Sequence, residues 1–234
     1  MVKIKKYKKE EKEDQLLENP KAISETLDSY ELFFQKNKKI ISTVLGVLIF
    51  ILTSFLLVNY YISTQNKLAQ DDMFQAVYYF ESDSLVKALN GDGNNFGFLE
   101  IIDEYNFTNA ANLSYFYAGS AYMKLGDFEN AIKYLKEFDG NDKIVQARSY
   151  SLIGDAYTEL EDYSSAIVFF KKAVFYNPNK FFTPSYLLKL ALVYEENGEL
   201  EDAYDCYSQI VKSYKESSEY QISVKNKSRL EGLI

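Results

Sequence analysis

Histidine and tryptophan are both absent from this 234-residue chain, and cysteine occurs only once, at Cys206. The absence of histidine removes the most frequent general base and the most frequent metal ligand of proteins. A single cysteine cannot form a disulfide within the chain, so cysteine usage says little about the cellular compartment. Without tryptophan, the 21 Tyr and 17 Phe carry much of the aromatic burial.

The chain also lacks an excess of positive charge. It contains 34 acidic and 26 basic residues, and its formal net charge is −8. A nucleic-acid-binding surface normally carries a surplus of Lys and Arg, so the composition argues against that class. The 47% hydrophobic and 26% charged residues are typical of a folded protein.

Two features invite a chemical interpretation, and neither is complete. In the segment NGDGNNFG, residues 90–97, the alternating Asn90, Asp92 and Asn94 resemble the first ligands of a calcium loop. Asn95 and Ile101, however, replace the Gly and Glu that an EF-hand requires. We therefore interpret it as a helix-breaking loop. Cys206 has no histidine to activate it, which favours a packing role over a nucleophilic one. We expect no catalytic residue, metal or cofactor.

The longest apolar run extends from Ile40 to Ile62 and contains no charged residue. At about 1.5 Å per residue a helix of this length spans about 35 Å, enough to cross a hydrocarbon core of about 30 Å. No small-x-small cleavage site follows the run, so it predicts an uncleaved transmembrane helix. Within it, Ser42 and Gly46 form a small-xxx-small pair that either seats another helix or reflects chance composition.

The charges on either side of this run predict its orientation. Lys36, Lys38 and Lys39 precede it, whereas Asp71 and Asp72 follow it. The positive-inside rule then places residues 1–39 in the cytoplasm and the bulk of the chain on the other side. The arm begins with a charged stretch that is typical of a solvated, disordered segment. It continues as an amphipathic juxtamembrane helix from Pro20.

Three segments repeat after the span, beginning at Ala118, Ile153 and Leu190, with spacings of 35 and 37 residues. When the three segments are aligned, three positions, which we call columns, carry the same kind of residue in every segment. They are a small residue at Gly119, Gly154 and Ala191, a tyrosine at Tyr122, Tyr157 and Tyr194, and an alanine at Ala131, Ala166 and Ala203. Such periodicity predicts repeats of two short antiparallel helices.

Each column has a physical reason. The small residue lets the first helix of a repeat approach the second, where we expect the alanine twelve residues later to meet it. The tyrosine fills the space between its own helical pair and the neighbouring repeat. Gly126 and Gly198 permit a left-handed turn between the helices, where the second repeat has Glu161. Asp127 and Asp162 can cap the helix that follows.

These columns resemble the tetratricopeptide repeat, including Pro178 at the close of the second repeat, although Lys143 and Lys215 stand at that position in the other two. We therefore predict an all-α protein, with an N-terminal single transmembrane helix followed by a tetratricopeptide-repeat α-solenoid. The expected parts are a cytoplasmic arm and juxtamembrane helix (1–39), the transmembrane helix (40–62), a degenerate first helical pair (63–111), three repeats (112–215) and a terminal capping helix (216–234).

In repeats of this kind a concave groove is lined by the first helix of each pair, on the face turned away from the second. Side chains there either contact a partner or are simply solvated. The carboxylate-binding members of the class use Asn in the groove, where this chain has Ser120, Asp155 and Leu192, so an acidic groove argues against carboxylate capture. The predicted groove residues are Phe116, Ser120, Met123, Ser151, Asp155, Thr158, Leu188, Leu192 and Glu195.

The order of span and repeats, the stretch FFQKNKK before the span and the stretch FQAVYYFESDSLVKALNGDGNNFGFLEIIDEY after it resemble the YfgM family, especially its Bacteroidota branch. This resemblance implies a non-enzymatic ancillary subunit of the SecYEG translocon in the bacterial inner membrane. Its span would dock beside SecYEG. Its periplasmic repeats would contact unfolded secretory proteins as they emerge and hold a PpiD-like membrane-anchored chaperone.

Two other classes remain open at this point. A membrane-anchored adaptor of another envelope machine, in cell division or outer-membrane assembly, would share the span and the repeats but have different partners. An enzyme is the other class, and the absence of histidine, of metal-ligand clusters and of a nucleophile motif argues against it.

Overall fold

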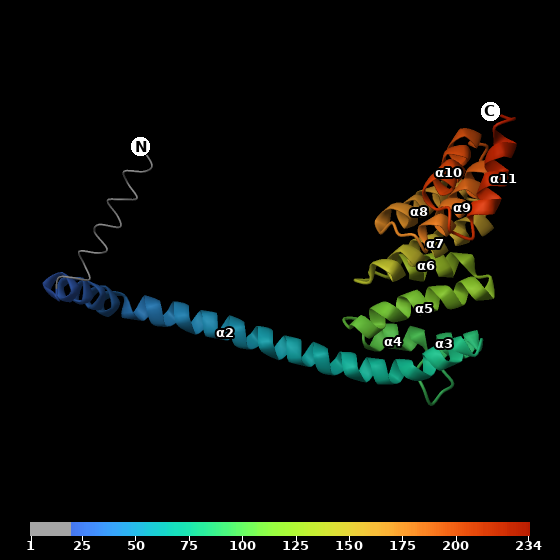
Figure 1. The fold of residues 1–234 in the computed structure, drawn as a ribbon. Coiled ribbons are helices and arrows are strands. Elements are labelled where there is room, and N and C mark those ends of the chain that lie inside the picture. The colour runs from blue at the N-terminus through green and yellow to red at the C-terminus, as the bar shows by residue number, and fades with distance from the viewer. Residues whose placement is uncertain (1–19) are drawn as a thin grey trace, which may run out of the picture. The chain divides into compact units, whose positions relative to one another are not determined.

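The computed structural model describes residues 20–234, and every regular element in that range is an α-helix (Figure 1). The charged arm of residues 1–19 lies outside the described residues. The helices are α2 (Pro20–Glu81), α3 (Leu85–Asn90), α4 (Phe98–Glu104), α5 (Asn109–Leu125), α6 (Phe128–Glu137), α7 (Lys143–Glu159), α8 (Tyr163–Tyr176), α9 (Thr183–Glu196), α10 (Leu200–Ser213) and α11 (Tyr220–Leu230).

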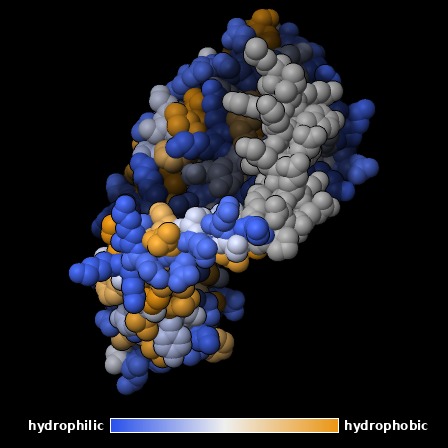
Figure 2. Space-filling model, turned by 90° about the vertical axis from the view of Figure 1, so that its left-hand side faces the viewer, coloured by the Kyte–Doolittle hydropathy of each residue, from blue (hydrophilic) through white to orange (hydrophobic). Residues whose placement is uncertain are grey.

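Helix α2 continues without a break through residues 39–40 and 62–63, so the juxtamembrane helix and the apolar run are one element. Of the described helices it is the one long and apolar enough to cross a membrane, and none of its most apolar window is buried. Figure 2 views this helix from its N-terminal end and shows orange apolar side chains exposed on it. A continuous apolar surface of this kind is stable in lipid rather than in water.

The chain divides into two compact units, the first ending at Tyr60 and the second beginning at Tyr61. In the second unit the helices pack in sequence: α5 on α6, α7 on α8 and α9 on α10, with α6 against α7 and α8 against α9. Helix α11 covers the last pair. Aliphatic and aromatic side chains of successive pairs share apolar clusters, so each repeat buries its faces against its neighbours.

The small residues at Gly119 and Gly154 permit close helix packing. A Cβ added at Gly119 would lie 2.5 Å from Cγ of Leu135, and one added at Gly154 would lie 2.8 Å from the Phe170 ring. Both partners come sixteen residues after the glycine rather than twelve. These side chains lie one turn beyond Ala131 and Ala166, the alanines predicted to meet the glycines, and on the same helix face.

The turns inside the repeats follow the predicted chemistry. The carboxylates of Asp127 and Asp162 accept hydrogen bonds from the backbone N–H of the third residue after each, which confirms both caps. Gly126 and Gly198 adopt φ values of +77° and +80°. Glu161 occupies the same left-handed conformation at φ +57°, which is unfavourable for a residue with a Cβ.

The tyrosine column connects one repeat to the next. The Lys136 ammonium of α6 lies 5.1 Å from the ring centroid of Tyr157 in α7 and donates a 2.7 Å hydrogen bond to its hydroxyl. One repeat later, Lys171 of α8 lies 5.4 Å from the ring centroid of Tyr194 in α9. The two lysines therefore occupy equivalent positions and make equivalent cation–π contacts across successive repeat boundaries.

The end of α2 packs into the second unit beside α3, α4 and α5, where Ala69 and Ala76 are fully buried. The Tyr105 hydroxyl, just after α4, donates a 2.6 Å hydrogen bond to the Asp72 carboxylate. This hydrogen bond, together with burial, raises the pKa of Tyr105 to about 12. The polar contact therefore ties residues 61–81 of α2 to the solenoid.

The loop at residues 90–97 is held by its own polar groups. Asp92 accepts hydrogen bonds from the backbone N–H groups of Asn94 and Asn95 and from the Tyr79 hydroxyl. These hydrogen bonds, that of Tyr79 first, lower the pKa of Asp92. A Cβ at Gly97 would lie 2.3 Å from the carbonyl oxygen of Leu89, so this loop needs glycine there. Between residues 20 and 234 no three metal-binding side chains gather.

Candidate binding groove

The nine predicted groove residues lie on α5, α7 and α9, the first helices of the three pairs. On α5 they serve internal packing. The Phe116 ring lies 5.4 Å from that of Phe138, and the Ser120 hydroxyl donates a 2.7 Å hydrogen bond to the Phe116 carbonyl. Met123 packs against a buried cluster and is half-buried. This part of the groove offers few free polar groups.

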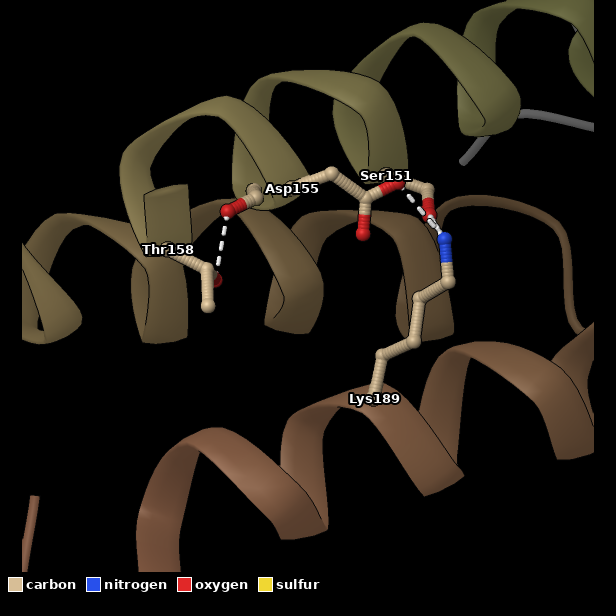
Figure 3. Close-up of polar contacts among 5 residues, drawn as sticks. Ser151, Asp155, Thr158 and Lys189 are labelled. Atoms are coloured by element: carbon tan, nitrogen blue, oxygen red, sulfur yellow. Dashed lines mark hydrogen bonds and ion pairs between the residues drawn. The ribbon is translucent and has the colours of Figure 1, made fainter. Parts of the chain in front are cut away.

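The middle of the groove contains an ion pair between α7 and α9 (Figure 3). The Lys189 ammonium lies 2.6 Å from Oδ2 of Asp155 and 3.4 Å from the Ser151 hydroxyl. Thr158 instead donates its hydroxyl hydrogen to the carbonyl of Gly154, within its own helix. Three side chains from neighbouring repeats thus form one polar cluster.

Partial burial in this cluster disfavours the charged form of the Asp155 carboxylate. Burial raises its pKa above the usual range for aspartate, although the nearby Lys189 ammonium acts in the opposite direction. Neither side chain is fully enclosed, because 26% of the Asp155 side chain and 38% of the Lys189 side chain are exposed. The pair is therefore a partly solvated link between the second and third repeats.

Lys189 was missed by sequence reasoning, although the repeat period contains the signal. The 37-residue offset aligns Leu188 with Ser151, so the next residue, Lys189, can reach back towards the preceding repeat. The prediction counted only residues facing away from the second helix and so omitted this neighbour-facing position. Lys189 adds a positive charge to a surface predicted to be acidic.

The remaining predicted residues differ in their availability. Leu188 packs partly against the core, whereas Leu192 is 47% exposed and is the only exposed member of the nine. Glu195 accepts a 2.7 Å hydrogen bond from the Tyr207 hydroxyl and forms an ion pair with Arg229 of α11. The last helix thus engages Glu195, and Leu192 is the free apolar side chain.

In the first unit, Ser42 and Gly46 lie on α2. The Ser42 hydroxyl donates a 3.0 Å hydrogen bond to the Lys39 carbonyl one turn earlier, which satisfies it without a partner helix. A Cβ at Gly46 would meet no atom within 4 Å. The small-residue face is therefore open within this unit.

Cys206 is buried in α10 among apolar side chains. Burial, reinforced by the nearby carboxylates of Asp202 and Asp205, raises the pKa of its thiol to about 12. A thiol in that range is almost entirely protonated at neutral pH, so it is a poor nucleophile.

Comparison with known proteins identifies the repeats. Tetratricopeptide-repeat family models match residues 114–142, 147–180 and 185–217. A crystal structure of a Podosopora anserina putative kinesin light chain with nearly identical TPR-like repeats covers 72% of this chain and 87% of its own, with a TM-score of 0.53 and 15% identity. A point variant of that protein gives the same TM-score and identity, with 86% of its chain covered.

The structure of MamA is also similar, with 21% identity and a TM-score of 0.44, covering 58% of this chain and 84% of its own. Among curated proteins, none matches this chain. Because the identity to the kinesin light chain repeats is so low, that likeness shows the fold alone.

Together, the fold and the family matches define the class. The chain is an all-α protein in which a long apolar helix precedes a tetratricopeptide-repeat solenoid, as the sequence predicted. Repeats of this class are protein-interaction scaffolds and are typically not enzymes. For this protein, therefore, the repeats indicate a scaffold that binds other proteins.

Proposed function

We propose that this protein is a membrane-anchored scaffold of the Sec protein-export translocon. The order of its parts is the observation that carries the proposal: an exposed apolar helix precedes a repeat solenoid of the protein-binding class. The resemblance of residues 74–105 and of the FFQKNKK stretch to the translocon-associated YfgM family supports the choice of machine. The solenoid would hold a PpiD-like chaperone or contact emerging secretory chains.

The proposed topology is a single pass through the bacterial inner membrane. Lysines precede residues 40–62 and acids follow them, which favours a cytoplasmic N-terminus and a periplasmic solenoid. Tethering confines the repeats to a thin layer near the exit of the channel. A tethered domain reaches a high effective concentration there, so its individual contacts can be weak.

Affinity purification through a C-terminal tag, from native membranes in a mild detergent, tests this proposal. We expect SecY and a PpiD-like protein to be recovered. Recovery of cell-division or outer-membrane-assembly components without SecY would contradict the translocon role and move the scaffold to another envelope machine.

A photocrosslinking pair tests which solenoid face is used. A photoreactive residue at Leu192, in the groove, is compared with one at Val168, on α8; their exposures are 47% and 50%. We expect partner adducts from position 192 in excess of those from position 168. Equal yields from both positions would contradict a groove-directed interaction.

A further inference from the structure

Acidic residues are unevenly distributed along the chain. Residues 163–194, which form α8, the following loop and most of α9, contain four lysines and no Asp or Glu. The rest of the chain after position 62 carries more than twice as many acidic as basic residues. Because this stretch lacks acidic residues, the surface that it forms is less negative than the rest of the domain.

The two edges of the solenoid also differ in charge. Because successive helices run antiparallel, the turns within repeats and the loops between repeats lie at opposite ends of the helices, as the α5–α6 turn and the α6–α7 loop show in Figure 1. Together with two helix residues on either side of each connection, the turns hold nine acids and one lysine, whereas the loops hold five acids and five lysines. The turn windows are residues 124–129, 158–164 and 195–201, and the loop windows are residues 136–144, 175–184 and 212–221.

Large aromatic side chains are exposed where α8 meets α9, on the less acidic edge. We call Phe175, Tyr176, Phe181 and Phe182 the aromatic corner; Phe175 is 67% exposed and Phe181 is 74% exposed. The Lys180 ammonium lies 5.3 Å from the Phe181 ring centroid. Figure 2 faces this edge and shows orange side chains among blue ones where the grey atoms do not cover it. The aromatic corner is thus both apolar and basic.

A cavity of about 530 Å³ adjoins the aromatic corner. Its lining includes Lys180 and Phe181 from the α8–α9 loop, together with Lys212 from the end of α10 and Lys215 from the α10–α11 loop. Two acids of the α10–α11 loop, Glu216 and Glu219, also line it. Three ammonium groups against two carboxylates give the cavity a small positive balance, in contrast to the acidic turns.

We propose that the aromatic corner docks on the anionic surface of the lipid bilayer. The inference rests on the membrane anchor of the proposed function and adds an orientation for the solenoid. Tyr and Phe rings can enter the interfacial zone of a bilayer, and each lysine near an anionic surface adds electrostatic attraction. The acidic turns on the opposite edge are repelled by the same surface, so both edges favour one orientation.

The anchor makes the bilayer the best-supported occupant of this surface. With α2 in the membrane, the solenoid is tethered to the bilayer, so even a weak attraction to lipid headgroups is strengthened by the tether. The mixture of rings and lysines is also that of membrane-surface segments. An acidic protein surface is the competing occupant, and the experiment below separates it from lipid.

The absence of tryptophan provides a direct test, because a single introduced indole is the sole reporter of its kind. The full chain carrying Phe181→Trp is reconstituted into phosphatidylcholine vesicles that contain brominated lipid, with or without phosphatidylglycerol. We expect several-fold stronger bromine quenching, with a blue-shifted emission, when phosphatidylglycerol is present. About 1 M salt should abolish the difference, because the Debye length then falls to about 3 Å.

Two matched indoles separate docking from anchoring. Leu160→Trp places the reporter among the acidic turns and should be little quenched. Phe50→Trp lies in the apolar run and should be quenched in both lipid mixtures if α2 is inserted. Failure at position 50 would contradict the anchor, whereas quenching at 50 with none at 181 would contradict docking alone.

Charge reversal completes the test. Lys180→Glu combined with Lys215→Glu, in the Phe181→Trp chain, should lose the phosphatidylglycerol-dependent part of the quenching. Retention of the full effect would contradict the electrostatic argument. Protection of the indole from aqueous iodide only when another protein is added, without bromine quenching, would overturn the proposal in favour of a protein-docking surface.

Discussion

At the scale of single residues, the solenoid contains positions where the side chain and the local structure conflict. Glu161 takes a left-handed backbone conformation that its counterparts fill with glycine. Asp155 is partly buried beside one lysine, and its pKa is raised in spite of that lysine. Both positions allow the sign of a mutation to be stated in advance.

Replacing Glu161 with glycine should stabilise the protein. The left-handed conformation costs a residue with a Cβ about 1–2 kcal/mol, and glycine's greater unfolded-state freedom offsets part of the gain, so we expect about 0.5–1 kcal/mol. Chemical denaturation measures the change. Gly126→Ala, at the same position of the first repeat, should destabilise by a similar amount. Destabilisation by Glu161→Gly would contradict the strain argument.

Replacing Lys189 with methionine should destabilise the protein in a pH-dependent way. Asp155 would lose its cation and its pKa would rise further, so its charged form would weaken the fold above that pKa. The loss should be about 1 kcal/mol at pH 7, because the pair is partly solvated, and should shrink as acidification protonates Asp155 in the folded state.

Urea denaturation of this variant at pH 7 and at pH 4.5 provides the measurement. The double variant Asp155→Asn with Lys189→Met removes both charges and should recover part of the loss at pH 7. A destabilisation that is equal at the two pH values would show that Lys189 acts through packing alone.

At the scale of helices, the repeat columns position one helix on the next. The regular spacing of the columns predicted the helical pairs, their caps and their glycine turns, because these depend on local chemistry. The contact that Gly119 makes with Leu135 could not be placed from the sequence, because it depends on how the helices cross. Lys189 was missed for a related reason: its contact lies across a repeat boundary.

Gly119→Ala should destabilise the first repeat. The new Cβ would lie 2.5 Å from Leu135 Cγ and 3.0 Å from the Leu135 backbone nitrogen, so the helices must separate. Such overpacking costs about 1–3 kcal/mol. Thermal or urea unfolding measures it, and the double variant with Leu135→Ala should lose less than the sum of the single changes. Strict additivity would contradict direct contact.

Tyr105→Phe tests how the end of α2 is attached to the solenoid. The lost hydrogen bond to Asp72 should cost about 1 kcal/mol at neutral pH. Because the folded pKa of Tyr105 is raised to about 12, the contribution is complete below about pH 10, the unfolded value, and is lost as the pH rises through 12. Stability curves of the two proteins should therefore converge at alkaline pH, and parallel curves would contradict this.

At the scale of the whole molecule, the protein combines an apolar helix with a repeat scaffold. The uncharged apolar run and the charges on either side of it predicted the candidate span, and the regular spacing of similar residues predicted the repeats. Neither of them specifies a partner, since tetratricopeptide surfaces are built from generic helix faces. Leu192 shows this clearly: it is exposed and apolar, yet nothing in its sequence surroundings identifies what would cover it.

The most direct test of the central claim compares the tagged full chain with a tagged chain lacking residues 1–60, which retains the compact second unit. Circular dichroism should show that the shortened chain is helical and unfolds cooperatively. The scaffold proposal predicts that the full chain co-purifies with SecY from detergent-solubilised membranes and that the shortened chain does not. A folded, shortened chain that still recovers SecY, or a full chain that recovers none, would contradict it.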